Sequence, residues 1–132
     1  MGMYTELLLK CEIKEDTPPV EMAVIKYLLG DSDGLGKPDE LPDHHFFNKE
    51  KWDFIGNSCS YYHTPIVVNE INKTYVFMRC DLKNYGGEIE AFLDWIWKYI
   101  DEPEGQCIGW FWYEENDRPD LLILTDTGWT FA

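Results

Sequence analysis

The N-terminal segment alternates between apolar and polar side chains over residues 4–14, and most of the intervening positions are charged. A period of two residues is that of a β-strand with one face in the core and the other in water. The segment is therefore predicted to be a half-buried strand. The positions on its buried face are Thr5, Leu7, Leu9, Cys11 and Ile13.

Two later segments have the spacing of amphipathic helices. Thr17 and the prolines that follow it suit a helix N-terminus, and Gly30 suits its end, so one helix is predicted up to about Leu29. Its buried residues are expected to be Val20, Val24, Tyr27 and Leu28. A second helix is predicted over residues 87–101, where apolar residues recur every three or four positions. These residues are Ile89, Phe92, Leu93, Ile96, Trp97 and Ile100.

Two β-hairpins are expected around the second helix. The first joins Tyr61–Val68 to Thr74–Leu82 through a turn at Asn69–Lys73, and Pro65 marks its first strand as an edge strand or a bulged one. The second joins Cys107–Glu114 to Leu121–Thr125. Residues 128–132 are expected to pack as a last short strand.

The order of these elements indicates an α+β fold in one domain, residues 1–132. Its first six elements, β-α-β-β-α-β, match the ferredoxin-like split β-α-β arrangement, with an extra C-terminal β-hairpin strand. Both helices should pack on one face of an antiparallel sheet, because the first strand alternates on one face only. Residues 31–51 form a long acidic loop, and loops of this length are often functional.

The composition narrows the class of protein. Six Trp, eight Tyr and seven Phe provide a core, so the formal net charge of −14 over 132 residues belongs to a folded surface. Such a surface repels nucleic acid and anionic membranes and attracts basic proteins. The apolar runs are too short to span a bilayer, and the N-terminus has no basic signal region. Four cysteines without a CxxC motif indicate reduced thiols, so a cytoplasmic location is expected.

Catalytic and metal-binding motifs are weak in this chain. The stretch Asp31–Gly36 lacks the ligand spacing of a calcium loop, and the adjacent His44 and His45 do not converge on one ion. Cys59 has His63 nearby but no helix N-terminus to lower its pKa. We therefore expect no enzyme activity, no cofactor and no metal.

Two candidate surfaces remain. The first is a set of carboxylates on the second helix and the long loop, expected to occupy a basic surface of a nucleic-acid-handling protein. Its residues are Glu88, Glu90, Asp94, Asp101, Asp39, Glu40 and Asp43. The second is an aromatic sheet face for a small nucleotide or for a second copy in a homodimer. Its residues are Tyr75, Phe77, Arg79, Trp110 and Trp112.

The second hairpin has aromatic residues on both faces. Trp110 and Trp112 share one face, and Phe111 and Tyr113 share the other. Monomers rarely expose large apolar patches, so one face should be covered by the C-terminal tail or by another chain.

Three stretches resemble a group of small uncharacterised proteins from phages and mobile elements of Gram-positive bacteria. They are Leu41–Phe47, Ser60–Pro65 and Arg79–Glu90. The resemblance implies a viral or prophage accessory protein, and such proteins often inhibit host defences. Anti-CRISPR proteins are similar to this chain in size and acidity.

Overall fold

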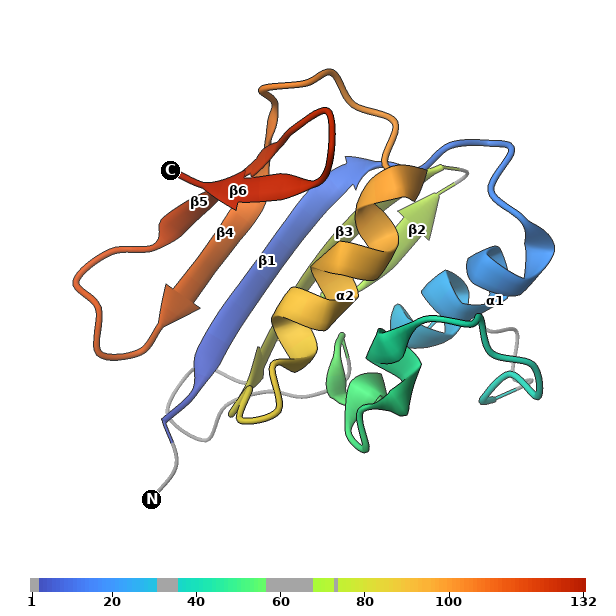
Figure 1. The fold of residues 1–132 in the computed structure, drawn as a ribbon, viewed down its shortest axis with the longest axis horizontal. Helices are drawn as coiled ribbons and strands as arrows, with labels where there is room; N and C mark the ends of the chain where they lie inside the picture. The colour runs from blue at the N-terminus through green and yellow to red at the C-terminus, as the bar shows by residue number, and fades with distance from the viewer. Residues whose placement is uncertain (1–2, 31–35, 57–67, 73) are drawn as a thin grey trace.

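A computed structural model describes residues 3–30, 36–56, 68–72 and 74–132. It is an α+β fold in which the helices lie on one face of a six-stranded antiparallel sheet (Figure 1). The strands are β1 (Thr5–Glu12), β2 (Glu70–Asn72), β3 (Tyr75–Leu82), β4 (Cys107–Tyr113), β5 (Asp120–Leu124) and β6 (Trp129–Phe131). The helices are α1 (Pro19–Leu28) and α2 (Glu88–Ile96), with 3₁₀ turns η1 (His45–Asn48), η2 (Trp52–Phe54) and η3 (Trp97–Tyr99).

Strand β1 lies inside the sheet, whose order is β2-β3-β1-β4-β5-β6. It pairs along its whole length with β3, from Thr5 opposite Leu82 to Glu12 opposite Tyr75. Its first five residues pair on the other side with β4. Every neighbouring pair is antiparallel, so residues opposite each other point to the same face.

The core lies between the sheet and the helices, as the alternation predicts. All five residues expected on the inner face of the first strand are buried, and the inner residues of β3 are buried with them. Of the six core residues expected in the second helix, five are buried and Trp97 is half-buried. The buried five are Ile89, Phe92, Leu93, Ile96 and, after the end of α2, Ile100. In α1, Val24 and Leu28 are buried, whereas Val20 and Tyr27 are only half-buried.

Three local details differ from the expectations. Thr17 does not cap α1, because its hydroxyl donates to the carbonyl of Lys14 at 2.6 Å and the N-cap position is Pro18. The helix predicted over 87–101 tightens into η3 and ends at Tyr99. Residues 70–72 form β2 where a turn was expected, and the strand expected over 61–68, with Pro65, lies almost entirely outside the described residues.

The C-terminal tail forms the predicted last strand. Strand β6 pairs with β5 at the edge of the sheet, and the main chains of Leu121 and Ala132 exchange two hydrogen bonds. The ring of Phe131 lies 5.1 Å from that of Phe111, and the indole Nε1 of Trp129 donates to Asp94 Oδ1 at 2.9 Å. The tail therefore covers the Phe111 side of the second hairpin, which is the side of the helices.

Gly109 allows β4 to approach β1. Its φ is +153°, and a β-bulge separates it from Cys107 in the pairing with β5. An ideal Cβ at this position would lie 1.8 Å from the carbonyl oxygen of Leu8. Because that oxygen belongs to the main chain of a central strand, it cannot move aside without disturbing the sheet.

We predict that Gly109→Ala lowers the free energy of unfolding by more than about 3 kcal/mol, through the clash and the positive φ together. Urea denaturation followed by circular dichroism measures the change. Gly128→Ala is the control, since nothing lies within 4 Å of its added Cβ, and it should change stability by less than about 0.5 kcal/mol. Equal effects of the two substitutions would contradict the role given to Gly109.

Candidate functional site

The face of the sheet opposite the helices brings the predicted aromatic residues together. Tyr75, Phe77 and Arg79 of β3 share this open face with Trp110 and Trp112 of β4, because their register partners in β1 are Glu12, Lys10, Leu8 and Glu6. Tyr75 is 44% exposed, and Leu121, opposite Trp110 on β5, is 42% exposed. Both α-helices pack against the other face (Figure 1).

A buried carboxylate lies at the centre of the open face. Glu6 of β1 is 3% exposed although it occupies the polar side of the alternation. Its Oε1 atom accepts hydrogen bonds from Arg79 Nε at 2.8 Å and lies 2.6 Å from Arg79 Nη2. Its Oε2 atom accepts a hydrogen bond from the indole Nε1 of Trp110 at 2.6 Å. One side chain therefore joins three neighbouring strands.

The Glu6–Arg79–Trp110 network fixes the orientation of Arg79 and Trp110 on the open face. Charge-assisted hydrogen bonds to a carboxylate are stronger than neutral ones, and a buried carboxylate needs them to offset its lost hydration. The Arg79 side chain remains 37% exposed, so it neutralises Glu6 from the solvent side. The sequence analysis missed Glu6, because its alternation indicates only a solvent-facing position and the partners come from two distant strands.

A pocket of about 290 Å³ opens beside this network. It is lined by Glu6, Arg79, Trp112, Glu114 and Asn116. The indole Nε1 of Trp112 donates to the main-chain carbonyl of Asn116 at 3.0 Å. Glu114 Oε1 accepts a hydrogen bond from the main-chain N–H of Tyr4, so this carboxylate also has a fixed position.

Four carboxylates lie around the aromatic residues of the open face, together with one exposed cation, Lys10 opposite Phe77. Glu12 lies opposite Tyr75 and Glu70 lies opposite Phe77, so both point to this face, and both are exposed. Glu114 and the exposed Glu115 follow β4 at the other end. We call these four residues the acidic rim.

The acidic set expected on the helical side is split by the structure. Glu88 is only 8% exposed, and its Oε1 atom accepts from the main-chain N–H of Gly86 at 3.2 Å. Glu90 is half-buried and accepts from Asn84 Nδ2 at 2.8 Å. These two carboxylates stabilise the start of α2 instead of facing a partner. The members that remain exposed are Asp94, Asp101, Asp39, Glu40 and Asp43.

Asn84 lies just before helix α2, whose N-cap is Gly87. It adopts a left-handed conformation with φ +58°, and its Oδ1 atom accepts from the N–H of Ile89 at 2.8 Å. Asparagine tolerates this conformation better than most residues. The N–H of Ile89 is thus bound by a side chain, and Glu88 and Glu90 in the first turn of α2 oppose the binding of an external anion there.

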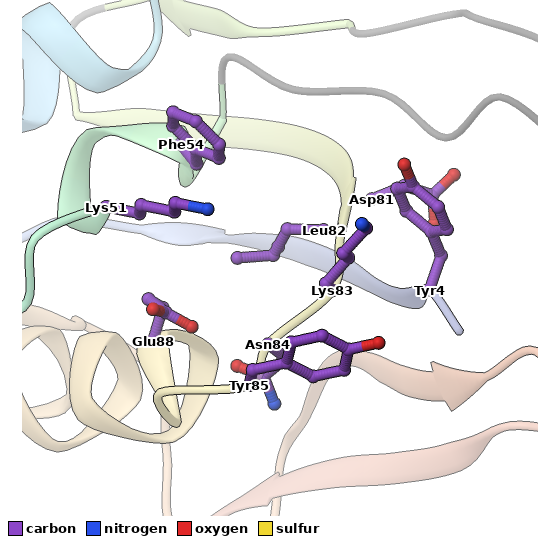
Figure 2. A pocket seen from close by; sticks show the side chains of 9 residues that line it. All are labelled: Tyr4, Lys51, Phe54, Asp81, Leu82, Lys83, Asn84, Tyr85 and Glu88. Carbon is purple, nitrogen blue, oxygen red and sulfur yellow. The ribbon is translucent and has the colours of Figure 1, made fainter. Parts of the chain in front are cut away.

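A second pocket, of about 330 Å³, lies at the start of α2 (Figure 2). It is lined by Tyr4, Lys51, Phe54, Asp81, Leu82, Lys83, Asn84, Tyr85 and Glu88. The ammonium groups of Lys51 and Lys83 lie 5.6 and 6.0 Å from the ring centres of Phe54 and Tyr85. The carboxylates of Asp81 and Glu88 balance the charge of these two lysines. The side chains of Asn84 and Glu88 already make hydrogen bonds at the start of α2. The pocket therefore carries no net charge with which to select an ionic ligand.

The two adjacent histidines lie where η1 meets α2. His44 Nδ1 accepts from the N–H of Phe46 at 3.1 Å and so caps η1. His45 Nε2 lies 3.9 Å from Asp94 Oδ2. Burial lowers the pKa of His44 below its ordinary value of 6.5, and His45 acts in the same direction, although Asp94 and Asp43 oppose it.

Two of the described thiols, Cys11 and Cys80, are buried and poor nucleophiles. Burial raises the pKa of Cys80 to about 12 and raises that of Cys11 even further above its ordinary range. Cys59 and His63 lie outside the described residues. Within the described ranges, no three His, Cys, Asp or Glu side chains are grouped so that they could hold a metal ion. No helix in those ranges is long and apolar enough to cross a bilayer.

Comparisons with known proteins identify no relative. No family model matches the chain, and neither a curated protein nor a solved structure matches it significantly. The candidate site is therefore assigned from its own geometry.

We predict that removing Arg79 lowers the free energy of unfolding more than removing the charge of Glu6 does. Arg79→Met leaves a buried carboxylate without its cation and should cost about 3 kcal/mol, the lower end of the range for such losses, because Arg79 is partly exposed. Glu6→Gln keeps one acceptor oxygen but turns an NH₂ donor towards Arg79 or Trp110, and it should cost about 1–2 kcal/mol. Urea denaturation of both variants measures these costs.

The double variant Glu6→Leu/Arg79→Met provides the check on this pair. It removes both charges, so it should be more stable than Arg79→Met alone. If Arg79→Met costs no more than Glu6→Gln, then Arg79 is not the counter-ion on which the buried carboxylate depends.

We also predict that His44 makes the protein less stable under mildly acidic conditions. A lowered pKa in the folded state means that the unfolded chain binds the proton more readily, so this contribution is complete above about pH 6.5 and is lost as the pH falls below it. His44→Asn keeps a capping acceptor but does not titrate. The Tm of the wild type should therefore fall further than that of the variant between pH 7.5 and 5.5, by calorimetry. Parallel curves would disprove the assignment.

Proposed function

We propose that this protein is a non-enzymatic binding protein that occupies a basic surface of a nucleic-acid-binding protein, using the open face of its sheet. The observation that carries the proposal is one surface with aromatic side chains at its centre and the acidic rim around them. Large aromatic residues and arginine anchor protein interfaces, and charges belong at the periphery.

The electrostatics of the whole chain favour a basic partner. A net charge of −14 attracts cationic surfaces over several ångströms and accelerates their encounter. A nucleotide would bring phosphate charges towards the acidic rim, so the small-nucleotide alternative is disfavoured. A homodimer would place two acidic rims in contact, which also costs free energy.

The proposal moves the main contact surface from the helices to the sheet. Glu88 and Glu90 accept hydrogen bonds at the start of α2. The helical side therefore offers fewer carboxylates to a partner than the sequence predicts. On that side Trp95 is buried, and the half-buried Trp129 already donates its indole N–H to Asp94. The exposed acids of the long loop, Asp39 and Glu40, therefore become the natural control.

The resemblance to phage and mobile-element proteins extends the proposal. It would make the partner a nucleic-acid-handling protein of a bacterial host-defence system, and the chain its inhibitor in the cytoplasm. For the fold, we further propose the ferredoxin-like split β-α-β class for the first six elements. The position of β3 between β1 and β2, and of β1 between β3 and β4, supports that class.

A capture experiment with matched variants tests the function. The immobilised protein is exposed to a nuclease-treated lysate of a Gram-positive bacterium, and retained proteins are quantified by mass spectrometry. We expect basic nucleic-acid-binding proteins that are released as the salt rises from about 0.1 to 0.5 M. The variants Tyr75→Ser and Glu12→Gln/Glu70→Gln should each reduce the amount of these retained proteins at least about fivefold.

The control variant Asp39→Asn/Glu40→Gln removes the same two charges from the helical side. It should retain the partner at close to the wild-type level. Equal loss in both double variants would mean that net charge alone causes retention, and selective loss in the control would place the interface on the helices. Either result would refute binding through the open face.

A further inference from the structure

We propose that the pocket beside Glu6 receives an arginine side chain of the partner protein. This inference rests on the proposed function and names the group that the open face recognises. The pocket is lined by Glu6, Arg79, Trp112, Glu114 and Asn116. We call it the Trp112 pocket.

The size and position of the Trp112 pocket suit a long side chain. Its volume of about 290 Å³ is several times the roughly 30 Å³ that one water molecule occupies. It lies between the aromatic centre of the open face and the acidic rim, because Trp112 and Glu114 belong to these two groups. A side chain from a flat basic surface would therefore enter it while the rest of that surface covered Trp110 and Phe77.

The charge of the pocket selects a cation. Glu6 and Arg79 neutralise each other at 2.6 Å, so Glu114 supplies the excess negative charge. Glu114 Oε1 is held by the N–H of Tyr4, and its Oε2 atom has no hydrogen-bond partner among the described residues. A fixed carboxylate with one free oxygen can accept a charge-assisted hydrogen bond without losing much conformational entropy.

The indole of Trp112 favours a guanidinium over an ammonium. Its Nε1–H is directed to the carbonyl of Asn116 at 3.0 Å, and its ring stands perpendicular to that of Trp110 at 6.2 Å, so its orientation is fixed. A planar guanidinium stacks on an aromatic ring and binds a carboxylate at the same time, which a compact ammonium does less well. Arg79 already places one guanidinium against this face, with Glu6 as its counter-ion.

An NMR titration with single amino-acid probes tests the pocket directly. N-acetyl-arginine amide is added to the ¹⁵N-labelled full chain, and N-acetyl-citrulline amide serves as the uncharged probe of nearly the same shape. We expect saturable shifts of the Trp112 indole N–H signal, which Trp112→Phe identifies. The arginine probe should bind about fivefold more tightly than the citrulline probe, the scale of one solvent-accessible ion pair.

The neighbouring carboxylates provide a matched pair of variants. Glu114→Gln keeps an acceptor for the Tyr4 N–H but loses the charge, and it should weaken the arginine probe about fivefold. Glu115→Gln removes the same charge one residue away, outside the pocket lining, and should change the affinity less than about twofold. An unchanged amide spectrum elsewhere confirms that Glu114→Gln is folded.

Three results would overturn the inference: no saturable shift, equal binding of the two probes, or equal loss in the two variants. Its failure can be distinguished from failure of the proposed function. If the arginine probe does not bind but Glu12→Gln/Glu70→Gln still loses the captured partner, the open face is the interface and the Trp112 pocket is not its arginine site. If the probe binds and capture is unaffected by that variant, the proposed function fails.

Discussion

The position of β1 between β3 and β4 is the constraint on which the rest of the structure depends. A strand that is paired on both edges can place one face entirely in the core and the other entirely in the open face. Its inner residues, from Thr5 to Cys11, are buried under the helices. Its outer residue Glu6 is within reach of Arg79 on one side and Trp110 on the other. The fold and the candidate site are therefore two sides of the same strand.

Burying the Glu6 carboxylate between these strands costs hydration free energy, but it fixes the positions of its two partners. An apolar residue at position 6 would complete an ordinary hydrophobic sheet face, and buried ion pairs are often no more stabilising than apolar replacements. Glu6 instead fixes the orientation of Arg79 and Trp110, so neither side chain has to be ordered when a partner arrives. Ordering side chains at an interface costs affinity, and a network that orders them during folding reduces that cost.

Local pattern predicted much of the fold, because the period of the apolar residues reflects burial directly. The alternation of β1 and β3, the apolar stripe of α2 and the last strand were all recognised in this way. What pattern could not show was pairing. The burial of Glu6 depends on partners that lie 73 and 104 residues away in the chain. Strand β2 and the contact of Glu88 with Gly86 are local, but neither follows from a period of apolar residues. The aromatic set was identified correctly as sharing a face, but its central carboxylate was not.

Acidity and aromatic content, which looked like separate properties in the sequence, meet on the open face. Carboxylates alone would give the chain solubility and a weak attraction for any cation, screened within about 8 Å at physiological salt. Aromatic residues alone would make the same face prone to self-association. Placed together, the acidic rim makes approach of a second acidic copy unfavourable, whereas a basic partner gains both the attraction and the apolar contact. The same charge that keeps the aromatic residues of this face from associating with a second copy thus selects the kind of protein that can cover them.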